Sequence, residues 1–193
     1  TENNKTFTAS ATQETTAEKV TKLGGLSPET IKVWVNDPIT WSKGVKATKD
    51  ENKDKVAALL KDATVTDKTQ PERTSAVAGE KEGTLLVTFK DTSTLEVPKQ
   101  MLIVSDEKVV DPADPDKLPD DKIKVEFAKG TGVTAVAEKN LYVKPNTTLV
   151  DADFPQATLE NGYKNLTWTP DDKVVTENNK TFTASATQET TAE

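Results

Sequence analysis

One segment of eighteen residues occurs twice in this chain without a single difference. Residues 1–18, TENNKTFTASATQETTAE, recur as residues 176–193, which is 175 positions later. Identity over this length does not arise by chance, and exact internal repetition is typical of tandem arrays. We therefore expect one repeat unit, with residues 1–18 as the tail strand of a preceding unit. A terminal tag is the alternative explanation.

The composition excludes most catalytic chemistry. The 193 residues include neither cysteine nor histidine. The sequence therefore has no disulfide framework, no thiol nucleophile, no thiolate or imidazole metal site and no Ser-His-Asp arrangement. We expect a protein that is not an enzyme and that has no catalytic residue, no metal ligand and no cofactor.

The charge and the apolar content indicate a solvated chain with small cores. Lys and Arg number 25 against 32 Asp and Glu, which gives a net charge of −7, and the two signs alternate along the chain. Nucleic acid and anionic membranes are therefore not expected as partners. Apolar residues make up 34% and aromatic residues 5%, which favours two thin cores over one large core. We expect a soluble fragment, since no apolar run approaches the ~20 residues that span a bilayer and no signal peptide is visible.

Residues 19–106 are predicted to form a first module with strands and one helix. Ile31, Val33 and Val35 alternate with polar positions, as in a half-buried strand. A helix capped by Thr48 or Asp50 is expected to end near Asp62, with its apolar face formed by Val56, Leu59 and Leu60. Further short strands are expected at 63–66, 85–89, 95–97 and 101–104, with a flexible break at 18–25 and a polar loop at 69–82.

A connector rich in aspartate and proline is predicted at residues 107–121. Because proline fixes φ and restricts the residue before it, we expect this linker to be extended, semi-rigid and solvated. A calcium loop is the alternative, although the regular loop signature needs a glycine and a distal glutamate that are missing here. The aspartates that suggest it are Asp106, Asp111, Asp114, Asp116, Asp120 and Asp121.

Residues 122–193 are predicted to form a second small module that ends in the duplicated strand. Alternating apolar residues indicate four short strands near 123–127, 141–143, 163–168 and 182–186, with a helical turn at 150–154. The last of these strands closes the sheet. Residues 1–18 lack such a module, so they are expected to be disordered or to pair with an exposed edge. The fold class is α+β and β-rich, with two modules in tandem, the first of which carries its helix on a mostly antiparallel sheet.

Several side chains are candidate binding groups. Trp34 and Trp168 are expected to pack in the cores, whereas Trp41 is expected to be partly exposed. The adjacent aspartates at 120–121 and 171–172 are expected to point into water rather than to form an acid–base pair. An intramolecular Lys–Asn amide bond is conceivable. Four Asn-x-Thr triplets are expected to have no role, and they begin at Asn4, Asn146, Asn165 and Asn179.

Two stretches resemble repeats of Gram-positive surface proteins. Residues 23–104 contain IKVWVNDPITWSKGV, the helix around KVAALL, and GEKEGTLLVTFKDTSTLEVPKQMLIV. This stretch resembles SSURE, the streptococcal fibronectin-binding surface repeat, and its hairpin GTLLVTFKDTSTLEVP is also similar to the Rib family of cell-wall spacers. The stretch from KIKVEFAKG to GYKNLTWTPDDKVVTENNKTFTASA resembles β-grasp-like surface repeats.

The resemblance implies an exported, extracellular virulence protein whose parent is attached to the peptidoglycan of the cell wall. It implies cell adhesion through a host extracellular matrix protein, namely fibronectin or plasminogen, and identifies no ligand-binding residue. Two functions stay open, and the resemblance favours the first, with the second as the alternative. One is an adhesin repeat that adds a host peptide strand to a sheet edge and gains avidity from the array. The other is a passive spacer that projects a distal adhesive domain.

Overall fold

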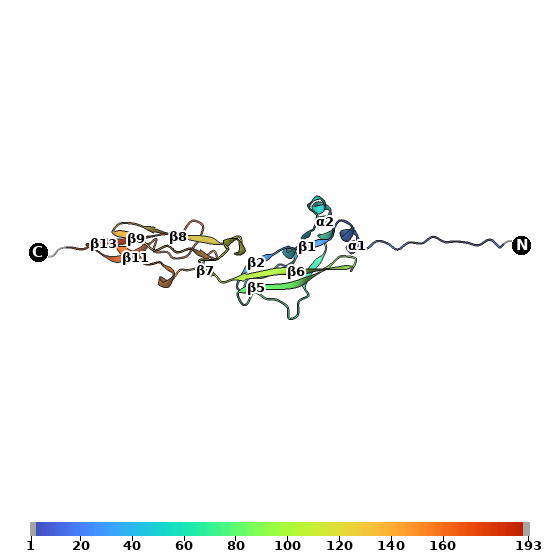
Figure 1. Ribbon diagram of the computed structural model, residues 1–193, viewed down its shortest axis with the longest axis horizontal. Helices are drawn as coiled ribbons and strands as arrows, with labels where there is room; N and C mark the ends of the chain where they lie inside the picture. The colour runs from blue at the N-terminus through green and yellow to red at the C-terminus, as the bar shows by residue number, and fades with distance from the viewer. Residues whose placement is uncertain (1–2, 191–193) are drawn as a thin grey trace. The chain divides into compact units, whose positions relative to one another are not determined.

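Figure 1 shows a computed structural model of the protein, which describes residues 3–190. The predicted fold class is confirmed in its coarse form: the fold is strand-rich α+β, with two α-helices in that range. The chain divides into two compact units that interleave in sequence. Unit 1 takes in the described residues up to 31, then 40–73 and 81–101, and unit 2 takes in 32–39, 74–80 and the described residues from 102 onward.

The N-terminal half contains both helices and a four-stranded sheet. The sheet has the order β2-β6-β5-β4, and β1 pairs antiparallel with β3. The elements are α1 (Thr16–Lys22), β1 (Leu26–Pro28), β2 (Ile31–Trp34), β3 (Val45–Ala47), α2 (Lys53–Leu60), β4 (Thr64–Asp67), β5 (Gly79–Thr88) and β6 (Thr94–Ser105), with 3₁₀ turns at Trp41–Gly44 and Asp50–Asn52.

Helix α2 is the predicted helix, although its capping differs from the prediction. Val56 is buried, and Leu59 and Leu60 pack against the same core. Neither Thr48 nor Asp50 caps it, because Asp50 begins a 3₁₀ turn that moves the N-cap to Asn52. The core that α2 covers is formed by Ala17, Val20, Val56, Leu85, Val87, Phe89 and Val97.

The predicted flexible break at 18–25 is wrong in its first half, where α1 ends. Ala17 and Val20 are buried in the core of unit 1, and the Thr15 hydroxyl accepts a hydrogen bond from the amide of Glu18. Two buried residues in one short helix give too little periodicity to detect. The loop predicted at 69–82 also ends early, since β5 begins at Gly79, and the strands predicted at 95–97 and 101–104 are one strand, β6.

The C-terminal half contains a five-stranded sheet with the order β12-β13-β8-β10-β7, and a separate antiparallel pair of β9 and β11. Its four predicted strands and the predicted turn near 150–154 are confirmed, and three strands of three or four residues were missed. The elements are β7 (Lys108–Val110), β8 (Ile123–Lys129), β9 (Val133–Val136), β10 (Leu141–Val143), β11 (Ala157–Leu159), β12 (Tyr163–Thr169) and β13 (Thr181–Gln188), with 3₁₀ turns at Pro115–Lys117 and Asp151–Asp153.

The aspartate- and proline-rich stretch has more structure than an extended connector. It contributes β7 to one edge of the five-stranded sheet and a 3₁₀ turn whose N-cap, Asp114, accepts a hydrogen bond from the amide of Asp116. Leu118 is buried. An apolar residue of this acidic stretch therefore packs inside the protein, which the composition of the stretch did not indicate.

Strand β13 lies inside the sheet rather than at its edge. It runs parallel to β8, with Phe182 opposite Phe127, and antiparallel to β12, with Ala184 opposite Trp168. Phe182 and Ala184 are fully buried. The core around them is formed by Ile123, Val125, Leu141, Val143, Leu149, Val175 and Phe182.

The two copies of the duplicated segment have different structures. Residues 3–13 form neither helix nor strand, and all of their side chains are exposed. The Phe7 side chain is 88% exposed, whereas the equivalent Phe182 is 0% exposed. The sequence of the segment permits a strand, but only the C-terminal copy has neighbouring strands to pair with. The positions of the segment at 1–2 and 191–193 lie outside the described residues.

We predict that the same substitution affects stability strongly in one copy and hardly at all in the other. Phe182→Ala should lower the free energy of unfolding by about 3–5 kcal/mol, because it leaves a cavity in the core. Phe7→Ala, its matched control in identical local sequence, should change it by less than about 0.5 kcal/mol. Urea denaturation followed by circular dichroism measures both. Equal effects would contradict the assignment of β13 to the C-terminal copy.

Candidate functional site

Exposed sheet edges are the predicted binding feature, and the edge strand β12 has features that disfavour strand addition. Strand β12 forms one edge of the five-stranded sheet. Its register with β13 shifts between Lys164 and Thr167, and Asn165 lies in the left-handed region with φ of 57°. The ammonium of Lys173 donates to the Trp168 carbonyl at 2.7 Å. Bulges and lysines at edge strands discourage pairing with another chain, so β12 offers only a short regular stretch before Pro170.

An open groove lies beside β12 and is lined by one aromatic patch and several charged side chains. Its volume is about 430 Å³, and its lining includes Phe154, Leu166, Trp168, Asp151, Asp171 and Lys173. Trp168 packs on Phe154 with ring centroids 5.1 Å apart and on Phe127 at 5.7 Å. Trp168 therefore acts mainly as a packing element, as predicted, with part of its surface left in the groove.

The paired aspartates do not form an acid–base site. Asp171 and Asp172 are exposed, and a carboxylate oxygen of Asp172 accepts a hydrogen bond from the Val174 amide at 3.0 Å. Asp120 and Asp121 are exposed, as predicted, and each also has a side-chain partner. Asp121 accepts a hydrogen bond from the indole nitrogen of Trp34 at 2.8 Å, and the Asp120 carboxylate lies 3.0 Å from the Lys32 ammonium.

Trp34 and Trp41 follow their predicted burial, whereas Trp168 is only partly buried against the core. Trp34 is 1% exposed, and its hydrogen bond to Asp121 satisfies the indole nitrogen. Trp41 is partly exposed, and the Arg73 guanidinium carbon lies 4.9 Å from the centre of its ring. Such a cation–π contact stabilises the partly open ring without a ligand.

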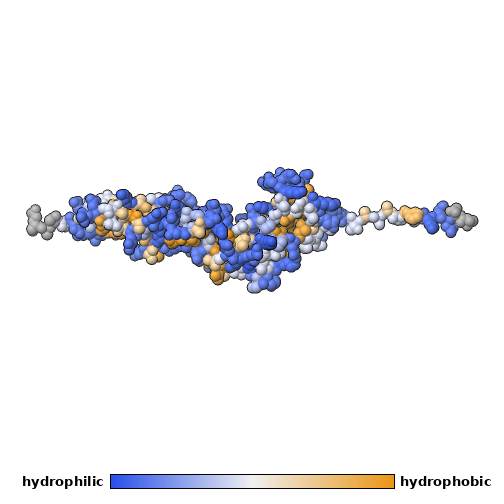
Figure 2. Space-filling model, in the orientation of Figure 1, coloured by the Kyte–Doolittle hydropathy of each residue, from blue (hydrophilic) through white to orange (hydrophobic). Residues whose placement is uncertain are grey.

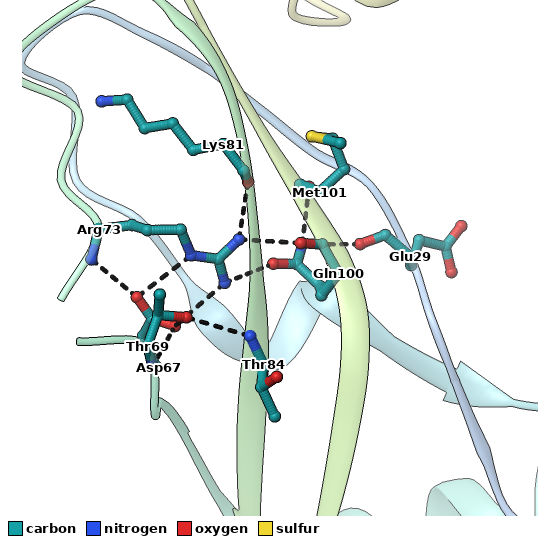
Figure 3. Close-up of polar contacts among 8 residues, drawn as sticks. All are labelled: Glu29, Asp67, Thr69, Arg73, Lys81, Thr84, Gln100 and Met101. Carbon is teal, nitrogen blue, oxygen red and sulfur yellow. Dashed lines mark hydrogen bonds and ion pairs between the residues drawn. The ribbon is translucent and has the colours of Figure 1, made fainter. Parts of the chain in front are cut away.

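Arg73, the sole arginine of the chain, lies at the centre of a buried polar network (Figure 3). The Arg73 and Asp67 side chains are 4% and 0% exposed and form an ion pair at 3.1 Å. The other guanidinium donors reach the carbonyl oxygens of Lys81 and Gln100 and the side-chain oxygen of Gln100. All five N–H donors of Arg73 are thereby used.

The network extends from Arg73 across unit 1. The Gln100 amide group donates to the carbonyls of Glu29 and Met101, which carries the network from the 67–73 loop through β6 to the start of β2. A Cβ atom at Gly83 would lie 2.6 Å from the guanidinium carbon, so β5 needs a glycine where Arg73 crosses it. Sequence reasoning missed the network because the 69–82 stretch was interpreted as a polar loop, although an isolated arginine among so many lysines was a signal.

The electrostatics of the network indicate a structural role. Burial would raise the pKa of the Asp67 carboxyl, but hydrogen bonds from Arg73 and Thr69 outweigh burial and hold that pKa below its usual value. Asp67 therefore stays ionised and accepts hydrogen bonds from Arg73 and Thr69. A fully satisfied ion pair with no free donor braces the fold and leaves no group for catalysis.

Comparison with known proteins found no family model and no curated protein sequence that matches this chain. The resemblance to SSURE, Rib and β-grasp-like repeats therefore stays a prediction. Within residues 3–190, no group of three or more acidic side chains is arranged to hold a metal ion. No helix in the same range is long and apolar enough to cross a bilayer.

We predict that the buried ion pair contributes strongly to the free energy of unfolding and that an exposed ion pair contributes little. Asp67→Asn should lower the free energy of unfolding by about 3–5 kcal/mol, because it leaves Arg73 buried without its counter-charge. The matched control is Glu80→Gln, which removes the exposed pair between Glu80 and Lys117 and should cost less than about 1 kcal/mol. Urea denaturation at neutral pH measures both, and a similar cost for the two variants would refute the bracing role.

We also predict a pH dependence for the same comparison. Because the pKa of Asp67 is lowered in the folded state, its contribution is present above the unfolded carboxyl pKa of about 3.9 and is lost as the pH falls through the lower folded value. The stability difference between the native chain and Asp67→Asn should be constant from neutral pH down to about pH 5 and should shrink below about pH 4. A difference that grows in acid would contradict this assignment.

Proposed function

We propose that the chain is a repeat unit of a bacterial surface stalk, which spaces a distal adhesive domain from the cell wall. This proposal rests on the duplicated segment. Residues 1–18 are identical to residues 176–193, and the C-terminal copy supplies the central strand β13 of a sheet. An exact copy of a required last strand, placed ahead of the unit, is the expected remnant of a preceding identical unit.

The surface supports a spacer better than an enzyme or a dedicated receptor. Figure 2 shows hydrophilic residues over most of the visible face, with hydrophobic residues confined to small patches. Five large apolar side chains within residues 3–190 are exposed and come from separate segments of the chain, namely Phe7, Val77, Val110, Val150 and Leu166. Single exposed apolar residues need no binding role, and a chain without thiols cannot scramble disulfides outside the cell.

The position of β13 also suits a load-bearing unit. Tension along an array would enter each unit through its last strand. Because β13 pairs with β8 on one side and with β12 on the other, withdrawing it requires both sets of hydrogen bonds to break and Phe182 to leave the core. A terminal strand at a sheet edge would be held on one side only.

A second candidate, an adhesin repeat for a host matrix protein such as fibronectin or plasminogen, is favoured by the groove beside β12. Leu166 is 38% exposed there, next to Trp168. Partly exposed aromatic and aliphatic groups among charged side chains are suitable anchors for an extended peptide. This candidate agrees with the resemblance to fibronectin-binding repeats.

We predict that the full chain shows no saturable binding to immobilised fibronectin or plasminogen up to high micromolar concentrations, measured by surface plasmon resonance at physiological salt. Two variants complete the test: Leu166→Asp alters the groove, and Val77→Asp alters an exposed residue away from it. Saturable binding that Leu166→Asp abolishes and Val77→Asp retains would overturn the spacer proposal in favour of the adhesin.

A further inference from the structure

We infer that the duplicated segment is a fixed joint between consecutive units, in which β13 of one unit passes into α1 of the next across only two residues. The inference rests on the tandem arrangement in the proposed function, and it does not depend on any ligand. It follows from combining the structures of the described parts of the two copies, residues 3–18 and 176–190.

The C-terminal copy defines the first half of the joint. Strand β13 ends at Gln188, and the next residue is still held, because the amide of Glu189 donates to the Gly162 carbonyl at 2.7 Å. The amide of Ala186 similarly donates to the Thr131 carbonyl at 2.8 Å. The strand is therefore anchored up to and including Glu189.

The N-terminal copy defines the second half. Helix α1 begins at Thr16, whose amide and hydroxyl both donate to one carboxylate oxygen of Asp91, at 2.7 and 3.0 Å. The Ala17 amide donates to the Ser93 hydroxyl at 3.1 Å. Hydrogen bonds from the Ser93 hydroxyl and the Thr16 amide hold the pKa of Asp91 well below its usual range. The turn between β5 and β6 thus fixes the start of α1.

Aligning the two copies leaves no free residue between the halves. Gln188 and Thr190 occupy the positions of Gln13 and Thr15 in the repeat. Only two positions then separate strand from helix. The first position is Glu189 in the C-terminal copy, whose amide donates to the Gly162 carbonyl. The second position is Thr15 in the N-terminal copy, which is the N-cap of α1. Two residues that are each held by an adjoining unit cannot act as a flexible linker.

The first of these positions has a further anchor on the helix side. In the N-terminal copy the Glu14 carboxylate lies 2.6 Å from the Lys22 ammonium of α1. The same glutamate is therefore placed to contact both units, through its backbone amide toward the preceding sheet and through its side chain toward the following helix. The partner that completes residues 3–13 is accordingly another copy of this chain, covalently upstream, which would bury the Phe7 position as it buries Phe182.

The test uses a two-unit chain, residues 1–193 followed directly by 19–193, so that the middle copy of the segment serves both units. Because the native sequence has no cysteine, Lys164→Cys in the first unit and Lys90→Cys in the second give one spin-label pair across the joint. The control carries a glycine–serine insertion of about ten residues between Gln188 and Glu189 of the middle copy. We expect the distance distribution of the uninterrupted chain to be no more than about half as wide as that of the control.

A second variant tests the contact that fixes the joint. Asp91→Asn in the second unit only should broaden the distribution toward that of the insertion control, while Asp91→Asn in the first unit should leave it unchanged. The inference would be overturned if the distance distribution were as wide in the uninterrupted chain as in the control. It would also be overturned if the two-unit chain formed concentration-dependent oligomers while its middle copy of the segment stayed unpaired. Fibronectin binding by a chain with a narrow distribution would reject the spacer function alone.

Discussion

The pairing of β13 with strands on both sides is the constraint on which the fold of unit 2 depends. Without β13, the order β12-β13-β8-β10-β7 would separate into a lone β12 and a three-stranded remainder. Phe182 would leave a core in which it meets Phe154 at 5.6 Å and lies among buried aliphatic residues. Independent stability of a small sheet needs at least three strands with a packed hydrophobic face, and the loss of Phe182 leaves that face incomplete in the three-stranded remainder. The last strand in the sequence is therefore essential to the five-stranded sheet.

The identical segment at the N-terminus separates local propensity from tertiary context. Its alternating threonine, phenylalanine and alanine residues suit a strand wherever they occur, yet residues 3–13 form none. The difference between Phe7 and Phe182 comes from the neighbouring strands, because most of the stability of a short strand comes from its cross-strand partners. This dependence makes the segment suitable as a connection, since residues 3–13 form no strand whereas the equivalent residues in the C-terminal copy do.

Much of the sheet structure was predictable because alternation reports burial directly. Leu85, Val87 and Phe89 were expected in a core and are buried there, as are Ile123 and Val125. Helix α1 and strand β7 are too short for their periodicity to appear. The contacts of Arg73 with Gln100 and of Trp34 with Asp121 join residues far apart in the chain. No local pattern predicts such pairs, and for that reason the network and the groove emerged only from the structure.

Residue-resolved amide hydrogen exchange by NMR tests the central claim most directly, since the two copies give identical peptides that mass spectrometry cannot separate. We expect strong protection of the amides in β13, and exchange at unstructured rates for the equivalent amides between residues 6 and 13. Protection of both copies to the same degree, or of the N-terminal copy alone, would contradict it.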